Sequence, residues 1–534
     1  MSSATRPETE AAAHPYRAGA IWQHLLLHLV ACYAIYIVLL FLYRITLHPL
    51  AGFPGPKIAG ASYCYEFWFD VIRQGRYTRE IVKLHARYGP IVRINPDELH
   101  CNDPAFMNEI YASGNRKRNK SKHFCASFPS DTRMGAGGTA DHSLHRLRIS
   151  EVNRFFSRSQ VIELEDLIQL NAQKLCDKLL AYRGCGPLDA ADAFNCFTTD
   201  TLTEYCFGNS TGFLDQPGWE PNYNKPLDVF FSMVHILRHF PWLTYLMERV
   251  PLPAVKVIST NIWQLLHHIK VEIPQQIQSM QDNFDGNTFK GRRTIFLQLL
   301  NSNLPAQEKT LERLAGEAHT ILVGGTGSTT TALCALTYHL LSNPPVRSKL
   351  TAELSTVMSD PAKPPCWSTL ERLPYFNAFV HEGLRLMHGS SQRLPRVATE
   401  EDLVYEGSWK PSPTSPSTNV TYVVPRGYAI GMSAYIMHSD ESIFPNASEF
   451  IPERWFHQKG EKDLGRYLFT FAKGSRQCVA MQLAYAEFYI CMAALTMRVL
   501  PFMELYQTKL SDIEYDHDEV IAKPKRGSKG FLST

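Results

Sequence analysis

Residues 471–480 hold the clearest chemical signal in the chain, because a glycine, an arginine and a cysteine occur there at short spacing. Gly474 permits a tight turn that a residue with a side chain would resist. Arg476 is placed to pair with a carboxylate of a bound cofactor. Cys478 begins an apolar helical pattern, and a cysteine at a helix N-terminus is biased towards the thiolate. A thiolate beside an arginine is what a haem iron needs as an axial ligand, although a cysteine before an apolar helix is more often a buried structural thiol.

Two charged motifs precede this segment. Glu382 and Arg385 lie three residues apart and therefore share one face of a helix. Arg454 ends a Pro-Glu-Arg triplet further along the chain. A single Glu and Arg pair of this kind is common in helices and identifies nothing. The two motifs and the cysteine segment, in this order, form a strong signal.

A third motif lies within a long helical pattern at residues 311–341, which is followed by two prolines. Its centre contains three glycines and several hydroxyl residues at positions 324–330. These residue types are poor helix formers, so we expect local unwinding there. The alternative is a helix crossing in which small residues allow close packing.

Together these motifs resemble those of the cytochrome P-450 family. Phe471, Gly474, Arg476 and Cys478 match the family's haem-binding loop, FxxGxRxCxG, and Ala480 stands where the last glycine is usual. The resemblance implies haem b as the cofactor, with Cys478 as the axial iron ligand. It also implies a mainly helical fold with small β-sheets. Phe471, Gly474 and Arg476 of the same loop are candidates for binding the cofactor.

The resemblance assigns roles to the remaining charged motifs as well. Glu382, Arg385 and Arg454 would form a buried salt-bridged cluster behind the haem, because buried charges must be paired to be tolerated. Arg396 lies in a stretch that resembles the part of the family contributing an arginine to a haem propionate. These four residues are therefore expected to support or bind the cofactor rather than to act on a substrate.

The helix near residues 141–156 departs from the family pattern. The family often has Trp or His followed four residues later by Arg, whereas here His145 is followed by Ile149. We take the nearby Arg148 as the candidate for a propionate contact. The basic residues 116–120 are interpreted as a solvated loop face, with contact to haem or to a redox partner as the alternative.

The glycine-rich centre of the long helix resembles the family's oxygen-binding groove, [A/G]-G-x-[D/E]-T-T. In that alignment Ser328 replaces the first threonine and Thr329 matches the second, so both are candidate catalytic residues. Gly327 stands where the acidic residue is expected. That acid commonly helps to relay protons, and the sequence identifies no substitute for it.

Composition divides the chain into four predicted segments. They are an N-terminal tail (residues 1–20), a transmembrane anchor (21–43), a proline-rich linker (44–57) and the catalytic domain (58–534). The anchor segment contains no Asp, Glu, Lys or Arg. As a helix it would span roughly 34 Å, enough to cross a bilayer core. A buried core helix is the alternative, and flanking charges do not set the orientation.

Within the catalytic domain, helical patterns occur at residues 78–88 and 166–180, and short β-type runs at 91–95 and 421–424. The formal net charge of +3 is too small to indicate nucleic-acid binding. The 12 cysteines include no CxxC pair, so we expect reduced thiols rather than disulfides.

The resemblance extends over almost the whole chain and is strongest to fungal microsomal members of the trichodiene-oxygenase-like type. It implies a monooxygenase that inserts one oxygen atom from O2 into a lipophilic substrate, here a terpenoid or polyketide intermediate of secondary metabolism. Electrons would come from NADPH through a separate NADPH-cytochrome P-450 reductase, since the chain has no Rossmann or flavin fingerprint. The enzyme would sit on the endoplasmic reticulum membrane with its catalytic domain facing the cytosol. The alternatives are a haem-thiolate isomerase that does not use O2 and a catalytically silent membrane haem protein.

Overall fold

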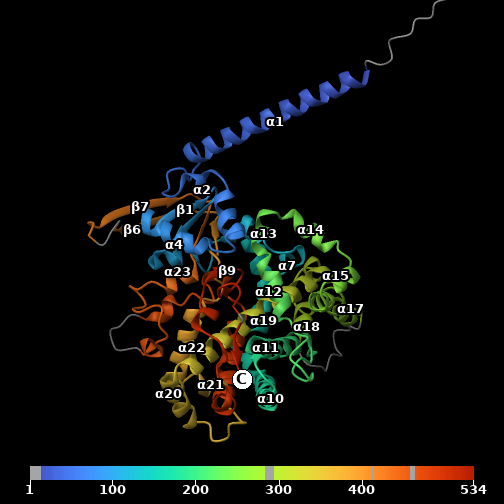
Figure 1. The fold of residues 1–534 in the computed structure, drawn as a ribbon, viewed down its shortest axis with the longest axis vertical. Helices are drawn as coiled ribbons and strands as arrows, with labels where there is room; N and C mark the ends of the chain where they lie inside the picture. The colour runs from blue at the N-terminus through green and yellow to red at the C-terminus, as the bar shows by residue number, and fades with distance from the viewer. Residues whose placement is uncertain (1–13, 283–293, 411–413, 457–462, 529, 534) are drawn as a thin grey trace, which may run out of the picture.

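An isolated helix, α1 (His14–Thr46), projects from the rest of the molecule (Figure 1). The computed structural model describes all residues except 1–13, 283–293, 411–413, 457–462, 529 and 534. Within α1, the part from Trp22 to Thr46 is long and apolar enough to cross a membrane, and its most apolar stretch is exposed, while Arg44 near its end contacts Ala61 and Arg93 of the body. The helix continues three residues past the predicted end of the anchor at position 43. The helix ends at Thr46, three residues before Pro49, which has no backbone N–H to continue the helical hydrogen bonds.

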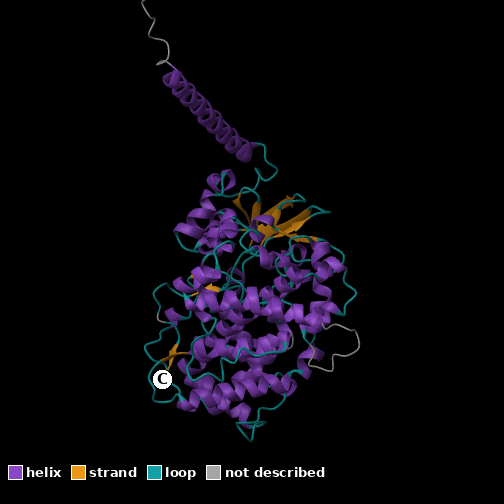
Figure 2. Cartoon of the chain, turned by 90° about the vertical axis from the view of Figure 1, so that its right-hand side faces the viewer, coloured by secondary structure: helices purple, strands orange, loops and turns teal. Residues whose placement is uncertain are grey.

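The body below α1 is mainly helical, with most of the strands near α1 and a few short ones lower down (Figure 2). Its longer helices are α4 (Tyr77–Tyr88), α8 (His142–Phe155), α10 (Glu165–Ala181), α11 (Ala190–Phe207), α12 (Asn224–Ser232), α16 (Thr260–His267), α17 (Ile273–Asp282), α19 (Leu311–Ser342), α20 (Pro344–Ser355), α22 (Pro374–Met387) and α24 (Met481–Arg498). Shorter helices include α2 (Lys57–Ala61), α3 (Cys64–Phe67), α7 (Ser130–Met134), α13 (Val234–His239), α14 (Trp242–Glu248), α15 (Leu252–Ile258), α18 (Ile295–Leu300), α21 (Trp367–Leu370) and α23 (Ala434–His438). The predicted helices at 78–88 and 166–180 are confirmed to within a residue or two at each end.

The largest described sheet has five strands in the order β1-β2-β8-β5-β3. Its strands are β1 (Ile91–Asn95), β2 (Glu98–Cys101), β3 (Arg118–Lys120), β5 (Arg396–Ala398) and β8 (Ala429–Gly431). A hairpin of β6 (Leu403–Trp409) and β7 (Thr418–Val424) lies beside it, and two small pairs join β9 (His517–Asp518) to β10 (Ala522–Lys523) and β4 (Leu188–Asp189) to β11 (Leu532–Ser533). The predicted strand at 91–95 is confirmed, and β7 begins three residues before the predicted 421.

Helix α19 runs through the centre of the helical body (Figure 1). The Thr310 side chain caps its first turn by accepting a hydrogen bond from the backbone N–H of Arg313 at 3.4 Å. The helix ends before Pro344, where the sequence can no longer supply backbone donors. Most of its apolar residues are buried in the main core cluster together with those of α11, α22 and α24. It is therefore a rigid element on which a site can be built.

The expected unwinding of α19 at positions 324–330 is wrong, because the helix is continuous there. The hydroxyls of Ser328, Thr330 and Thr331 each donate to the carbonyl four residues earlier, at 2.9, 2.9 and 3.0 Å. Gly325 allows close packing instead, since a Cβ at this position would lie 2.8 Å from Cδ2 of Leu202 on α11. The alternative expectation of a close-packed helix crossing describes this region correctly. Overall, the protein is mainly α with small β-sheets, preceded by one apolar N-terminal helix.

Candidate functional site

A cavity of about 400 Å³ separates the middle of α19 from the loop that precedes α24. Gly324, Gly325, Ser328 and Thr329 of α19 form one wall. Phe471, Arg476 and Cys478 of the loop and Arg396 of β5 also line it. The structure therefore brings together, at one cavity, six of the predicted catalytic and cofactor-binding residues. Gly474 and Arg148 do not line it.

Cys478 faces this cavity at the end of a tight loop. Its backbone N–H donates to the carbonyl of Phe471 at 2.9 Å, which closes the loop on itself. Although the Cys478 side chain is open to the cavity, desolvation by the surrounding protein atoms raises the pKa of its thiol to about 11. The expected bias towards thiolate is therefore not produced by the protein alone, since α24 begins only at Met481 and the side chain of Arg476 bonds elsewhere. A bound metal cation would supply the missing charge, because a coordinating thiol is deprotonated outright.

Gly474 shapes the loop without entering the cavity. Its backbone has a φ of +73°, and a Cβ there would lie 2.0 Å from the carbonyl oxygen of Tyr111. Only glycine tolerates both conditions. The next residue, Ser475, donates its backbone N–H to the carbonyl of Ala112 at 3.2 Å. Glycine at this position therefore lets the cysteine loop pack directly against the backbone of Tyr111 and Ala112.

Three cationic side chains meet at the side of the cavity. Lys120 on β3 and Arg396 on β5 are paired directly across two antiparallel strands. Arg476 lies near both, and its Nε is buried without a hydrogen-bond partner. Among the described residues, none forms an ion pair with any of the three cations. Like charges opposite each other are destabilising in a sheet, and buried charges need a counter-charge.

This cation group fits the two propionates of a haem. Burial and the neighbouring arginines lower the pKa of Lys120 to about 7, so a bound anion would restore its charge. Arg396 lies over the ring of Tyr111 and uses Nη1 for the carbonyls of Leu394 and Pro395, both at 3.1 Å, which leaves its other N–H donors to bind a carboxylate. With Cys478 on the wall of the same cavity, the described residues match the donors that a haem requires.

Arg148 is held away from the cavity, contrary to the prediction. Its Nε donates to Glu308 at 2.7 Å and its Nη1 to the hydroxyl of Thr139 at 2.9 Å. His145, one turn earlier on α8, lines the cavity instead. Burial and the nearby Arg476 hold the pKa of His145 far below its usual range, so its ring is neutral. We therefore move the candidate propionate contact on this helix from Arg148 to His145.

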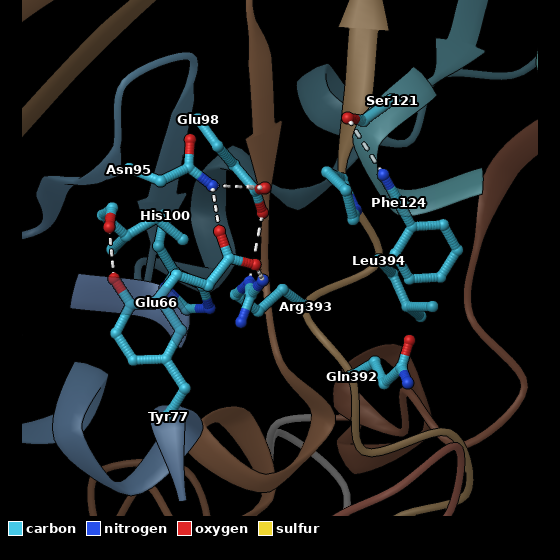
Figure 3. A network of polar contacts seen from close by, with 12 residues as sticks. Glu66, Tyr77, Asn95, Glu98, His100, Ser121, Phe124, Gln392, Arg393 and Leu394 are labelled. Atoms are coloured by element: carbon cyan, nitrogen blue, oxygen red, sulfur yellow. Dashed lines mark hydrogen bonds and ion pairs between the residues drawn. The ribbon is translucent and has the colours of Figure 1, made fainter. Parts of the chain in front are cut away.

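A buried polar network orients the segment that carries Arg396. Figure 3 shows Arg393 turned towards Glu66 and Glu98, with Asn95 beside them. Arg393 pairs with Glu66 and, at 3.3 Å, with Glu98, while Asn95 donates to both carboxylates at 2.9 and 3.2 Å. With Arg393 held in this network, Leu394 and Arg396, which follow it along the chain, line the cavity.

Glu382, Arg385 and Arg454 lie together in a second buried network on the far side of the cysteine loop. Arg385 donates to both carboxylate oxygens of Glu382, at 3.0 and 2.8 Å, and Arg454 donates to the same carboxylate at 3.0 Å. Arg385 also donates to the carbonyl of His438 at 2.9 Å. The His438 ring in turn accepts the backbone N–H of Phe469 at 2.8 Å. The cluster is thus joined to the start of the cysteine loop in two steps, and its supporting role stays a prediction.

Sequence reasoning missed two residues on the cavity wall. Residues 116–120 were interpreted as a solvated run, with haem contact as the alternative, and Arg116, Lys117 and Arg118 do pair with surface carboxylates, whereas Lys120 lines the cavity. The alternation of a strand would have indicated that every second residue turns inward. Glu487 on α24 lines the cavity as well, with 3 % of its surface exposed. Its position nine residues after Cys478 carries no periodic signal that separates it from other core-facing residues.

Comparison with known proteins agrees with this geometry. The family model described as cytochrome P450 matches residues 56–514. The chain belongs to the cytochrome P450 family. Cytochrome P450 monooxygenase ppzE of Metarhizium majus is 48% identical over 452 residues, which cover 82% of this chain and 93% of the relative. Cytochrome P450 monooxygenase tpcC of Cochliobolus heterostrophus is 36% identical over 93% of this chain and 94% of its own length.

A third similar protein carries a more specific name. Tryptophan 6-hydroxylase fscE of Fusarium equiseti is 36% identical over 92% of this chain and 93% of its own length. This P450 is accordingly a haem-thiolate monooxygenase. The haem supplies oxygen activation when bound, with electrons from a redox partner. Cys478 would hold the iron, and Arg396, Arg476, Lys120 and His145 would hold the propionates.

Replacing Lys120 with methionine in this P450 should weaken haem retention. Loss of one charge-assisted contact to a propionate, worth about 1.5–3 kcal/mol, speeds haem release roughly 10- to 100-fold. Transfer of haem to an excess of apomyoglobin measures the rate. Lys117→Met is the matched control, because Lys117 pairs with Glu400 at the surface and should leave the rate unchanged. Equal release rates in the two variants would show that Lys120 does not bind the haem.

Proposed function

We propose that this P450 oxidises a lipophilic terpenoid or polyketide intermediate of fungal secondary metabolism, at the endoplasmic reticulum membrane. The observation that carries the proposal is the apolar part of the cavity. Aromatic and aliphatic side chains from five separate segments face it, namely Phe124, Phe128, Leu202, Phe230, Phe231, Ile321, Val323, Val520 and Ile521. Such a wall favours a molecule that gains free energy by leaving water and offers few polar groups.

The membrane helix supports a substrate that partitions into lipid. In Figure 1, α14 lies at the same end of the body as α1. Trp242 and Tyr245 on α14 are 57 % and 53 % exposed, and Ile258 at the end of α15 is 78 % exposed. Large exposed apolar side chains of this kind are typical of surfaces that contact a membrane or a partner. A lipophilic substrate held in the bilayer would therefore be close to the catalytic body.

We further propose that electrons reach this P450 from NADPH through a separate NADPH-cytochrome P-450 reductase. The chain contains no nucleotide-binding fingerprint that could supply them internally. The endoplasmic reticulum, with the catalytic domain in the cytosol, is the compartment in which such a reductase and NADPH are both available. Cell fractionation with protease protection tests this. We expect a membrane-bound protein whose body is digested without detergent, and protection of the body would contradict the proposed orientation.

The relatives suggest which compounds to test as substrates, but they do not identify the substrate. One relative, from Fusarium equiseti, is named a tryptophan 6-hydroxylase. Indole-containing natural products therefore belong in the panel beside terpenoids and polyketides. Gly327 motivates one alternative, a haem-thiolate isomerase that does not use O2.

The test is a spectral titration followed by turnover. The haem-loaded chain in membrane vesicles is titrated with each compound, and a compound that displaces water from the iron shifts the Soret band. Compounds that bind are incubated with reductase, NADPH and 18O2, and the masses of the products are measured by mass spectrometry. We expect one 18O atom in the product of a terpenoid or polyketide. Conversion of a bound compound without NADPH or without 18O would instead support the isomerase.

A further inference from the structure

Residues 135–141, which we call the α7–α8 loop, join α7 to α8 and lie directly on α19. A Cβ at Gly135 would lie 2.1 Å from Oγ1 of Thr320, a residue of α19. A Cβ at Gly137 would lie 2.6 Å from Cγ2 of the same side chain. The hydroxyl of Thr139 donates to the carbonyl of Gly135 at 2.8 Å, which closes the loop on itself. The two glycines therefore let the loop backbone pack against the central helix.

The α7–α8 loop supplies backbone acceptors to two cations of the propionate site. Arg476 donates from Nη1 to the carbonyl of Thr139 at 2.5 Å. Its Nη2 donates to the carbonyls of Ala140 and Asp141 at 2.8 and 3.0 Å. Lys120 donates its backbone N–H to the carbonyl of Ala140 at 2.9 Å, and its ammonium donates to another carbonyl of the loop. The position of the loop therefore sets the direction of both cationic side chains.

Four buried charged side chains hold this loop in place. Arg148 of α8 donates from Nη1 to the hydroxyl of Thr139 at 2.9 Å and from Nε to Glu308 at 2.7 Å. Arg313 donates from Nε to Glu308 at 2.9 Å, and its Nη1 lies 2.6 Å from Glu317. Glu317 also accepts a backbone N–H of the loop at 3.0 Å. Two cations and two anions alternate in this network, so the buried charges are paired while the loop is held at two points.

Thr139 joins two guanidinium groups that do not contact each other directly. Its hydroxyl accepts from Arg148, and its carbonyl accepts from Arg476. Thr139 is 4 % exposed, so the loss of the Arg148 donor would leave a buried acceptor with an unmade hydrogen bond. A change at Arg148 is therefore transmitted to Arg476 through the backbone of Thr139.

We propose that Arg148 is a positioning residue for the haem. It fixes the α7–α8 loop through the hydroxyl of Thr139, and the loop carbonyls in turn direct Arg476 and Lys120 towards the propionates. Arg148 itself stays outside the cavity and does not touch the cofactor. This role differs from the direct propionate contact that the sequence predicts for Arg148.

The first test measures haem transfer from the haem-loaded full-length chain to an excess of apomyoglobin. Thr139→Val removes the hydroxyl with little change of shape, so we expect haem release about 10-fold faster, the effect of losing one hydrogen bond to a charged group. Thr139→Ser keeps the hydroxyl and should release haem at the wild-type rate. Arg154→Met is the matched control on α8, because Arg154 is 71 % exposed and pairs with Glu151. A wild-type release rate in Thr139→Val would overturn the proposal.

A double-mutant cycle separates the indirect route from a direct contact between Arg148 and the haem. Arg148→Met and Thr139→Val break the same link if Arg148 acts through Thr139. The double variant should then release haem about as fast as Arg148→Met alone, whereas independent effects would multiply. Multiplied effects, or fast release in Arg148→Met with normal release in Thr139→Val, would contradict the indirect route.

The reduction potential of the haem separates positioning from a general loss of stability. When Arg476 and Lys120 turn away, the propionate charges are less well neutralised, and negative charge near the iron disfavours its reduction. We therefore expect a lower potential in Thr139→Val and in Arg148→Met, with the red-shifted carbon monoxide band retained. Unfolding of the same haem-loaded variants in urea is measured in parallel. Earlier unfolding with an unchanged potential would show a structural role only and would refute the positioning role.

Discussion

Replacing Cys478 with alanine should abolish the red-shifted Soret band of the reduced carbon monoxide complex and all monooxygenase turnover. Only a thiolate axial ligand gives that band and supports O–O cleavage in a P450. In the structure Cys478 is the cysteine that lines the cavity, so no other described thiol can replace it. The measurement is a dithionite-reduced carbon monoxide difference spectrum of microsomes that contain the full-length chain.

The control for this prediction is Cys366→Ala. Cys366 is exposed and lies outside the cavity, so its loss should leave the red-shifted band intact. Haem content is measured in parallel, because a variant without haem would show no band for a trivial reason. A haem-loaded Cys478→Ala variant that retains the red-shifted band would disprove the ligand assignment. A wild-type protein with only the shorter-wavelength band of neutral ligation would do the same.

Replacing Arg385 with alanine should destabilise the fold by up to about 3–5 kcal/mol, the cost of breaking a buried ion pair, of which the remaining contact from Arg454 to Glu382 recovers a part. Glu382 is fully buried and would lose both of its contacts to this guanidinium. The carbonyl of His438 would also lose a donor, which loosens the connection to Phe469 and the cysteine loop. We therefore expect early unfolding in urea together with low haem occupancy, measured by circular dichroism and by the haem absorbance per chain.

Lys349→Ala provides the matched control. Its ammonium pairs with Glu453, next to Arg454, at 2.6 Å, but the two side chains are 58% and 39% exposed. Exposed ion pairs contribute about 0–1 kcal/mol, so this variant should unfold close to the wild type. Arg385→Lys tests the geometry, because an ammonium cannot make the forked contact to Glu382 and should recover only part of the stability. Equal stability of Arg385→Ala and Lys349→Ala would refute a supporting role for the cluster.

The motifs that recur at short spacing could be interpreted from the sequence. The family was indicated by three motifs in a fixed order: the Glu382 and Arg385 pair, the triplet that ends at Arg454, and the Cys478 loop. The fold class then followed from the family. The apolar run before position 43 and the strand at 91–95 were also recognisable, because their composition and length leave few alternatives. Local sequence specifies such features since they depend on neighbours along the chain.

The contacts of individual side chains were decided by tertiary structure. Sequence assigned a propionate contact to Arg148, but Glu308, 160 positions away, binds that guanidinium. Sequence placed Lys120 in a solvated loop, but pairing of β3 with β5 turns it into the cavity opposite Arg396. The unwinding expected in α19 is absent because Leu202 of α11 packs on Gly325. In each case the deciding partner comes from a distant segment.

The region around Gly327 shows the same division. Gly327 revealed from the sequence that the usual acid is missing, and nothing local could indicate a replacement. Only the fold showed that Thr329 of α19 and Glu487 of α24 line one cavity. The identity of the residues therefore determined which chemistry the chain can support. The packing of α19 and α24 determined which side chains reach the cavity, because contacts between distant segments form only in the folded chain.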